Sequence, residues 1–464
     1  MPKISLTLVI CTFRRDEFVL RNLRKLKHAG VLGKDNEVLV VDNSGSEELS
    51  AKIGPMEHVR VISQQNLGGA GGFTRGIYEV VRNHCAASAA NSDDHPEPYI
   101  LLMDDDIEFE PENIQRTMAL LERSDGRTCI SGQLYNIHSP HELFEAGATF
   151  GERKPFDWKS YLKMAPSDDL NQWNKDSENH QIDYGGWWYF CFPLKAVAAT
   201  GLPLPLFIRG DDVDYGRRLV DAGYRIVSPE GIGVRHETFD ARYGTWVFYY
   251  ETRNCLILLA TSYRFRGWGE KQIWDFIEHS VLKDLSRFDY GRAALKLEAI
   301  RDFLRGPDSL ERCDLRHPKI VALYNQYSLE ARSAEADFSE RIDLKRSQGK
   351  SLMGRLGFFI LRMLGPISRH MTSKKHVLLC DSVFTSKHIP FNTQSILFDH
   401  TLSGKSYYFE YSAEHAKALQ AELINTKKYW DQSYHTAAQT WKDAIPTLSS
   451  FGYWGRVFEN KSDS

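Results

Sequence analysis

The sequence predicts an α/β fold with a mostly parallel, doubly wound sheet, followed by a mainly helical C-terminal region. Two observations carry this prediction. Short apolar runs, rich in β-branched residues, alternate with helical patterns over about the first 135 residues, which is typical of a parallel sheet covered by helices. Polar residues directly follow the apolar runs, and ligands of such sheets bind beyond the carboxyl ends of the strands.

Four strands and three helices account for the alternation. The expected strands are Ile4–Cys11, Glu37–Val41, Val59–Ser63 and Tyr99–Met103. The expected helices are Asp16–Lys27, Phe73–His84 and Pro111–Leu121. Proline suits the first turn of the last helix, where its missing N–H has no intrahelical partner. The polar residues at the four strand ends are Thr12 and Arg14, Asp42 and Asn43, Gln65 and Asn66, and Asp104–Asp106.

A chain of 464 residues is long enough for two or three domains. We expect an α/β domain over 1–262, a helical region over 263–370 and an α/β or helical region over 371–464. Short strand-like runs at Val377–Cys380 and Ser395–Phe398 precede a helical pattern at Ala413–Lys442. The apolar stretch Leu352–Arg369 carries three arginines, which favours either a packed helix or an amphipathic helix on a membrane surface.

Composition narrows the class of protein. A net charge of only −3, with 26% charged residues, lacks the basic face of a general nucleic-acid binder. The seven cysteines are scattered and form no CxxC pair, which argues against a disulfide framework or structural zinc. The chain starts without the cleavage region of a signal peptide and has no apolar stretch of about 18 residues. We therefore expect a cytoplasmic protein, or one peripheral at the inner face of the cell membrane.

Three adjacent carboxylates directly follow the fourth expected strand. In an extended segment alternate side chains share a face, so Asp104 and Asp106 point together while Asp105 points elsewhere. Adjacent carboxylates repel one another unless solvent or a cation compensates. Their hard oxygens suit Mn²⁺ or Mg²⁺, which bridge readily to a diphosphate. The alternative is a solvated acidic loop.

A glycine-rich run follows the third expected strand. Asn66, Gly68, Gly69 and Arg75 belong to this segment, NLGGAGGFTRG at 66–76. Glycines permit close backbone approach to a ligand, and Arg75 adds a cation. A dinucleotide-binding GxGxxG follows the first strand instead, so this segment is expected to be a glycine loop of a nucleotide-sugar site. The alternative is a flexible turn.

A second acidic pair and a histidine follow much later in the chain. Asp211 and Asp212 suit a general base that deprotonates an acceptor hydroxyl. His236 is either a third metal ligand or a structural histidine. Trp187 and Trp188, after two glycines, form either an aromatic platform for an acceptor or part of a core strand.

Together these motifs resemble the family 2 glycosyltransferases of the GT-A fold, and more narrowly the bacterial galactofuranosyltransferases. The resemblance covers about residues 4–260 and rests on five features: NLGGAGGFTRG at 66–76, MDDDI at 103–107, GGWWYF at 185–190, DDVDYG at 211–216, and His236. Arg209 and Gly210 precede the second acidic pair where relatives carry an aromatic residue.

The resemblance implies a role for each candidate residue. Asp104 and Asp106 would handle the ribose and the divalent metal, and His236 would complete the metal site. Asp212 would be the catalytic base, with Asp211 beside it placing the acceptor. The uridine would meet Thr12, Arg14 and Asp42, and the acceptor would meet Trp187 and Trp188. The remaining candidates for donor binding are Asn66, Gly68, Gly69, Arg75, Asp104 and Asp105.

The expected function is inverting, metal-dependent transfer of galactofuranose from UDP-galactofuranose to a lipid-linked glycan during surface polysaccharide synthesis. Three alternatives remain: transfer of another sugar, such as rhamnose from dTDP-rhamnose; a non-catalytic carbohydrate-binding protein on the same fold; and a nucleotidyltransferase or metal phosphohydrolase. The expected partners are the nucleotide sugar and a glycan or glycolipid, with no nucleic acid. Peripheral membrane contact and a homo-oligomer stay open.

Overall fold

The computed structural model describes residues 3–88, 96–150, 158–160, 182–237, 246–262, 268–310, 313–327, 340–342, 375–381, 393–400 and 405–459. The chain divides into two compact units, Met1–Thr238 with Asp443–Ser464, and Phe239–Lys442. The expected boundaries near residues 262 and 370 stay predictions. The stretch Leu352–Arg369, for which we weighed a membrane-surface helix, lies outside the described residues.

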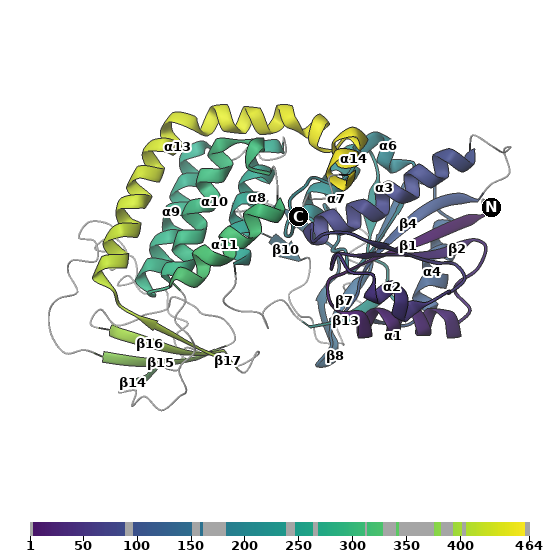
Figure 1. The fold of residues 1–464 in the computed structure, drawn as a ribbon, viewed down its shortest axis with the longest axis horizontal. Helices are drawn as coiled ribbons and strands as arrows, with labels where there is room; N and C mark the ends of the chain where they lie inside the picture. Colours follow the sequence, from purple (N-terminus) through teal and green to yellow (C-terminus); the bar gives the residue numbers. More distant parts are fainter. Residues whose placement is uncertain are drawn as a thin grey trace. The chain divides into compact units, whose positions relative to one another are not determined.

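The first unit is built on a seven-stranded sheet in the order β12-β6-β11-β4-β1-β2-β3, seen with its covering helices in Figure 1. The strands are β1 (Ile4–Thr12), β2 (Asn36–Asp42), β3 (Val59–Ser63), β4 (Glu97–Asp104), β6 (Thr128–Ser131), β11 (Tyr189–Pro193) and β12 (Arg225–Val227). All neighbours run parallel except at β11, which is antiparallel to both β4 and β6. This confirms the mostly parallel α/β fold.

Helices of this unit are α1 (Asp16–His28), α2 (Glu48–Ile53), α3 (Gly68–Ser88), α4 (Glu112–Leu121), α6 (Ala196–Thr200), α7 (Asp211–Asp221) and α14 (Phe451–Glu459). A smaller sheet has the order β5-β13-β7-β8. Its strands are β5 (Glu108–Phe109), β13 (Gly233–His236), β7 (Gln133–Asn136) and β8 (Ser139–Glu145), and a separate pair joins β9 (Ala148–Phe150) and β10 (Trp158–Ser160). The second acidic pair therefore begins α7, and the histidine ends β13.

The glycine run differs from the expected loop, because it forms the first turns of α3. A Cβ at Gly72 would lie 2.2 Å from Cys11 Sγ, and a Cβ at Gly76 would lie 2.2 Å from Val9 Cγ1. Glycine is a poor helix former, but here it lets α3 pack directly on β1. Close packing outweighs local propensity at this position.

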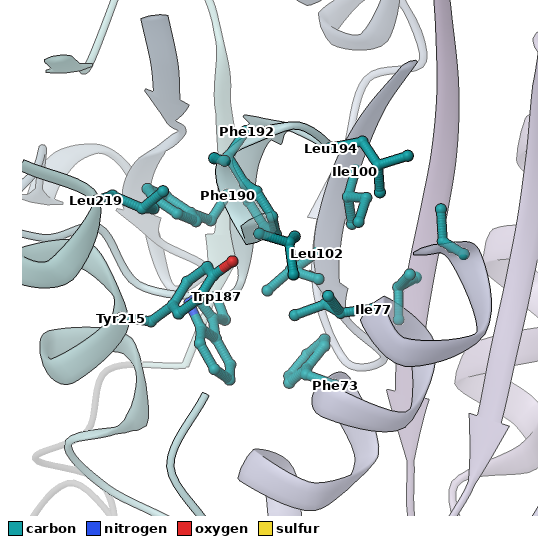
Figure 2. Close-up of a cluster of buried hydrophobic side chains, with 14 of the residues drawn as sticks. Phe73, Ile77, Ile100, Leu102, Trp187, Phe190, Phe192, Leu194, Tyr215 and Leu219 are labelled. Carbon is teal, nitrogen blue, oxygen red and sulfur yellow. The ribbon is translucent and has the colours of Figure 1, made fainter. Parts of the chain in front are cut away.

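The main core of the unit joins the sheet to α3, α7 and α14. Phe73 and Tyr215 flank Trp187, with ring centroids 5.3 and 6.3 Å from its own, and Figure 2 shows this group beside Phe190 and Phe192. The C-terminal helix closes the core through Trp454, whose side chain is 1% exposed and whose Nε1 donates to the Pro203 carbonyl at 2.9 Å. Residues at both ends of the chain thus share one core.

The second unit combines a helical group with a small sheet. Its helices are α8 (Val247–Thr261), α9 (Glu270–Ser286), α10 (Tyr290–Arg305), the short 3₁₀ helix η3 (Pro307–Leu310), α11 (Cys313–Tyr327) and α13 (Ala413–Leu448), whose last residues belong to the first unit. The sheet has the order β14-β15-β16-β17, formed by Glu340–Ile342, Lys375–Asp381, Thr393–His400 and Lys405–Glu410. Trp441 Nε1 donates to the Phe303 carbonyl at 2.9 Å, which ties α13 to α10. No helix among the described residues is long and apolar enough to cross a bilayer.

Candidate active site

Two acidic residues and a histidine form a candidate cation site. Asp104 ends β4, Asp106 follows in the next turn, and His236 ends β13. One ligand atom from each lies within 4.8 Å of the others. Carboxylate oxygens with one imidazole nitrogen suit Mn²⁺ or Mg²⁺. The residues therefore fit a divalent cation.

Electrostatics at this cluster follow from burial and like charge. Burial and the charge of Asp106 raise the pKa of Asp104 to about 7. Burial lowers the pKa of His236, but the hydrogen bond and charge of Asp106 outweigh that effect and raise it above its ordinary value. Packing carboxylates together in this way is costly without a cation.

The middle carboxylate of the run, Asp105, points away from the cluster and ties β4 to the end of β1. Its Oδ2 accepts a hydrogen bond from Thr12 Oγ1 at 2.7 Å, and its Oδ1 accepts one from Arg15 Nη1 at 3.0 Å. The same Arg15 nitrogen also contacts Asp106. Asn22 Nδ2 donates to the Asp105 carbonyl at 2.8 Å. A hydrogen bond thus joins Thr12 to Asp105, and Arg15 connects Asp105 to Asp106 of the cation cluster.

The second acidic pair lies at the N-terminus of α7, after a strained segment. Phe207 and Arg209 adopt positive φ values of 72° and 65°, which non-glycine residues seldom do. Burial and the charge of Asp212 raise the pKa of Asp211 to about 8, and the charge of Asp104 adds to this. Burial raises the pKa of Asp212 to about 6. The charge of Asp104 acts on Asp211, which indicates that the two acidic groups lie near each other.

The glycine run borders this second pair. A Cβ at Gly68 would lie 2.1 Å from the Phe207 carbonyl oxygen, and a Cβ at Gly69 would lie 3.9 Å from Asp211 Oδ2. Gly68 has a positive φ of 70°, and its N–H donates to Asn66 Oδ1 at 2.9 Å. Only a residue without a side chain fits at Gly68. This contact positions the strained segment that leads into α7.

Other candidate residues have partners that the sequence did not reveal. Asp42 accepts hydrogen bonds from the backbone N–H and the hydroxyl of Ser44, both at 2.8 Å. Arg75 donates from Nε to Glu79 at 2.9 Å, and its guanidinium lies 4.9 Å from the centre of the Phe458 ring. Both side chains are therefore engaged in contacts within the unit.

Arg14 and the tryptophan pair have contrasting surroundings. Arg14 is exposed, has a φ of 55° and lies over the Phe13 ring at 5.1 Å. Trp187 and Trp188 are each only 5% exposed. Trp188 Nε1 donates to the Gly132 carbonyl at 3.0 Å, whereas Trp187 Nε1 is buried without a hydrogen-bond partner. An acceptor role for the pair stays a prediction.

Sequence reasoning missed two groups at the site. Glu145, at the end of β8, is 8% exposed, and burial followed by the charge of Asp212 raises its pKa to about 8. Its Oε1 is buried without a hydrogen-bond partner. Nothing in the sequence places Glu145 near Asp212. The sequence could have revealed that Asn22 is buried, because it lies four residues before Leu26 and so shares the apolar face of α1.

A mostly parallel sheet with a cation site and a second acidic pair fits the glycosyltransferase class that the motifs predict. Comparison with known proteins agrees. The model of the family described as "Glycosyltransferase like family 2" matches residues 2–253, which is more than half of the chain. The chain therefore belongs to this family of glycosyltransferases.

Curated relatives of the chain include proteins named as galactofuranosyltransferases. Galactofuranosyltransferase GlfT2 of Mycobacterium tuberculosis is 28% identical over 325 residues, covering 65% of this chain and 48% of that protein. Galactofuranosyltransferase GlfT1 of Mycolicibacterium smegmatis is 26% identical over 218 residues, covering 46% of this chain and 65% of that protein. The chain thus spans about half the length of GlfT2.

Among solved structures, the mannosyltransferase PcManGT from Pyrobaculum calidifontis, in complex with GDP-Man and Mn²⁺, is 13% identical. The match covers 70% of this chain and 84% of that chain, with a TM-score of 0.38. A likeness at this level carries no argument about this site.

Proposed function

We propose that this enzyme transfers galactofuranose from UDP-galactofuranose to a glycan acceptor with inversion at the anomeric carbon. The acceptor is a lipid-linked glycan of a surface polysaccharide. The main support is that the cation cluster and the Asp211–Asp212 pair lie near each other. The curated relatives named as galactofuranosyltransferases support the donor sugar.

Asp212 acts as the catalytic base. With a pKa of about 6, its carboxylate is mostly ionised at neutral pH yet basic enough to take a proton. The acceptor hydroxyl gives this proton to Asp212 as its oxygen bonds to the anomeric carbon. The bond from that carbon to UDP breaks at the same time, and UDP leaves with the bonding electrons. Attack from the face opposite UDP inverts the configuration.

Asp211 binds the acceptor and does not act as the base. Its pKa of about 8 keeps it mostly protonated at neutral pH, so it donates a hydrogen bond to an acceptor oxygen. Asp104, Asp106 and His236 would hold Mn²⁺ or Mg²⁺. The chemistry supplied there would be neutralisation of the negative charge that develops on the departing diphosphate.

Donor and acceptor contacts complete the proposal. Thr12, Arg14 and Asp42 meet the uridine, and the exposed Arg14 guanidinium is free to approach an anion. Trp187 and Trp188 border the acceptor. These roles follow from the motif resemblance. Substituting each residue in turn and measuring sugar transfer tests them.

The deciding experiment measures sugar transfer from UDP-galactofuranose to a short galactoside, with Mn²⁺. Asp212→Asn is compared with wild type and with Asp221→Asn, a control at the other, exposed end of α7. We expect product from wild type and the control, a loss of about 10²–10⁴-fold in Asp212→Asn, and no product with EDTA. If product forms with dTDP-rhamnose and not with UDP-galactofuranose, the donor is dTDP-rhamnose. No transfer from any nucleotide sugar, with glycan binding kept, would favour a non-catalytic carbohydrate-binding protein.

A further inference from the structure

The second unit contains a cavity of about 220 Å³, and every residue that lines it belongs to that unit. Four chain segments meet there: the turn between α9 and α10, the end of α11, strand β17, and the link from β17 to α13. A cavity of about 150 Å³ accommodates benzene. This cavity therefore has room for one six-membered or five-membered ring with polar substituents.

Aromatic side chains make up most of the lining, and Tyr327 and Tyr408 are among them. The polar side chains include two carboxylates, a carboxamide and an imidazole, contributed by Asp289, Glu410, Gln326 and His415. No lysine or arginine lines this cavity in the described part of the chain, which disfavours phosphate as a ligand. Aromatic faces pack well on the C–H face of a sugar, while the polar groups exchange hydrogen bonds with its hydroxyls.

Contacts between lining residues fix the shape of the cavity. The Tyr290 hydroxyl donates to the Ser412 carbonyl at 3.2 Å and accepts from the Ser412 N–H at 3.0 Å. The His415 ring centroid lies 5.5 Å from that of Tyr290 and 5.1 Å from that of Tyr327. A pre-formed wall loses little conformational entropy when a ligand binds.

The turn between α9 and α10 is strained where it borders the cavity. Phe288 has a positive φ of 63°, which is an outlier for a bulky residue. Asp289 then begins α10 as its cap, accepting from the Arg292 N–H at 3.1 Å, so its carboxylate is held in place. Such strain is often found at ligand sites.

We propose that this cavity binds one sugar residue of a neutral glycan, as a site separate from the acidic one. The inference rests on the proposed function, because the acceptor polysaccharide supplies the ligand. A polymer held at a second site stays with the enzyme between additions, since linked sites raise the effective concentration of the chain.

Hydrogen exchange of the full chain, without donor, tests this proposal at the cavity itself. The probes are methyl β-galactofuranoside and methyl β-galactopyranoside, with tetramethylammonium and inorganic phosphate for comparison. We expect either sugar to slow exchange in the α9–α10 turn and in β17. Tyr408→Ala and Glu410→Gln should each raise the sugar concentration needed for half-maximal protection at least tenfold. This corresponds to a loss of about 1.4 kcal/mol in binding free energy.

Tyr429→Ala is the matched control, because Tyr429 is an exposed tyrosine of the same unit outside the cavity lining. It should leave the protection unchanged, and unaltered melting of all three variants shows that they fold. Protection by tetramethylammonium or phosphate but by neither sugar overturns the proposal, as does protection confined to the first unit. Normal transfer to a short galactoside with no protection at the cavity sinks this inference alone. Protection at the cavity without transfer from any nucleotide sugar sinks the proposed function alone.

Discussion

His236 Nε2 lies 3.0 Å from Asp106 Oδ1, although 130 positions separate the two residues. The contact joins the end of β13 in the small sheet to the turn after β4 in the large sheet. His236 Nδ1 contacts the Glu237 carbonyl, which leaves Nε2 facing the carboxylates. An imidazole oriented in this way is ready to bind a cation through Nε2.

Replacing His236 by alanine should weaken cation binding without unfolding the site. Two carboxylates remain, so we expect the Mn²⁺ concentration for half-maximal transfer to rise at least tenfold, about 1.4 kcal/mol. Direct Mn²⁺ titration should show the same shift. His138→Ala, which removes an exposed histidine, should leave both values unchanged. An unaltered Mn²⁺ requirement in His236→Ala would show that the imidazole is not a ligand.

Arg15→Gln should destabilise the first unit, because it removes the cation beside Asp105, whose side chain is 5% exposed. A buried carboxylate that loses a charged partner costs about 1–3 kcal/mol. Chemical denaturation measures this loss. Arg14→Gln, at an exposed neighbour, should change the free energy of unfolding by less than about 0.5 kcal/mol.

A double-mutant cycle isolates the ion pair. If Arg15 acts through Asp105, the second change Asp105→Asn costs much less in the Arg15→Gln background than in wild type. Additive losses would mean that the two side chains contribute independently.

Much of the first sheet was predictable because its strands are continuous apolar runs. Val59–Ser63 matches β3 at both ends, and Ile4–Cys11 falls one residue short of β1. Insertion of β11 between β4 and β6 was not predictable, since an antiparallel neighbour depends on contacts distant in sequence. The glycine run was wrongly expected to be a loop, because its helix depends on close packing against β1.

Parts of the site were predictable for a geometric reason. Asp104 and Asp106 were expected to point together because alternate side chains of an extended segment share a face. They were expected at the ligand-binding edge because they follow a strand of a parallel sheet. Glu145 was not found, because its place beside Asp212 depends on the small sheet. The packing of α14 in the core of the first unit was not predictable either, because the sequence of a helix does not show which surface it packs against.

Trp454→Ala should destabilise the first unit strongly. The change removes a side chain that is 1% exposed, together with its hydrogen bond to Pro203, a loss of about 3–5 kcal/mol. Hydrogen exchange in β4 and β11 reports this unit alone. Phe451→Ala, which truncates a side chain of the same helix that is 37% exposed, should cost far less. Equal effects of the two changes would mean that α14 does not belong to the core.

Glu145→Gln should stabilise the protein at alkaline pH. The pKa of Glu145 is raised to about 8 by burial and then by the charge of Asp212, whereas an unfolded glutamate has a pKa of about 4.3. The contribution of the protonated carboxyl is therefore complete below about pH 4 and is lost as pH rises through about 8. Glutamine has nearly the same shape and never ionises, so the variant escapes this loss.

Melting temperatures of the variant and wild type, measured without added metal, reveal the effect as a difference. We expect the variant to gain on wild type by several degrees between about pH 5 and about pH 9. Glu112→Gln, at an exposed position of α4, should show no such trend. A constant difference across this range would mean that Glu145 ionises in the folded protein as easily as in the unfolded chain, and that its carboxyl is not held neutral beside Asp212.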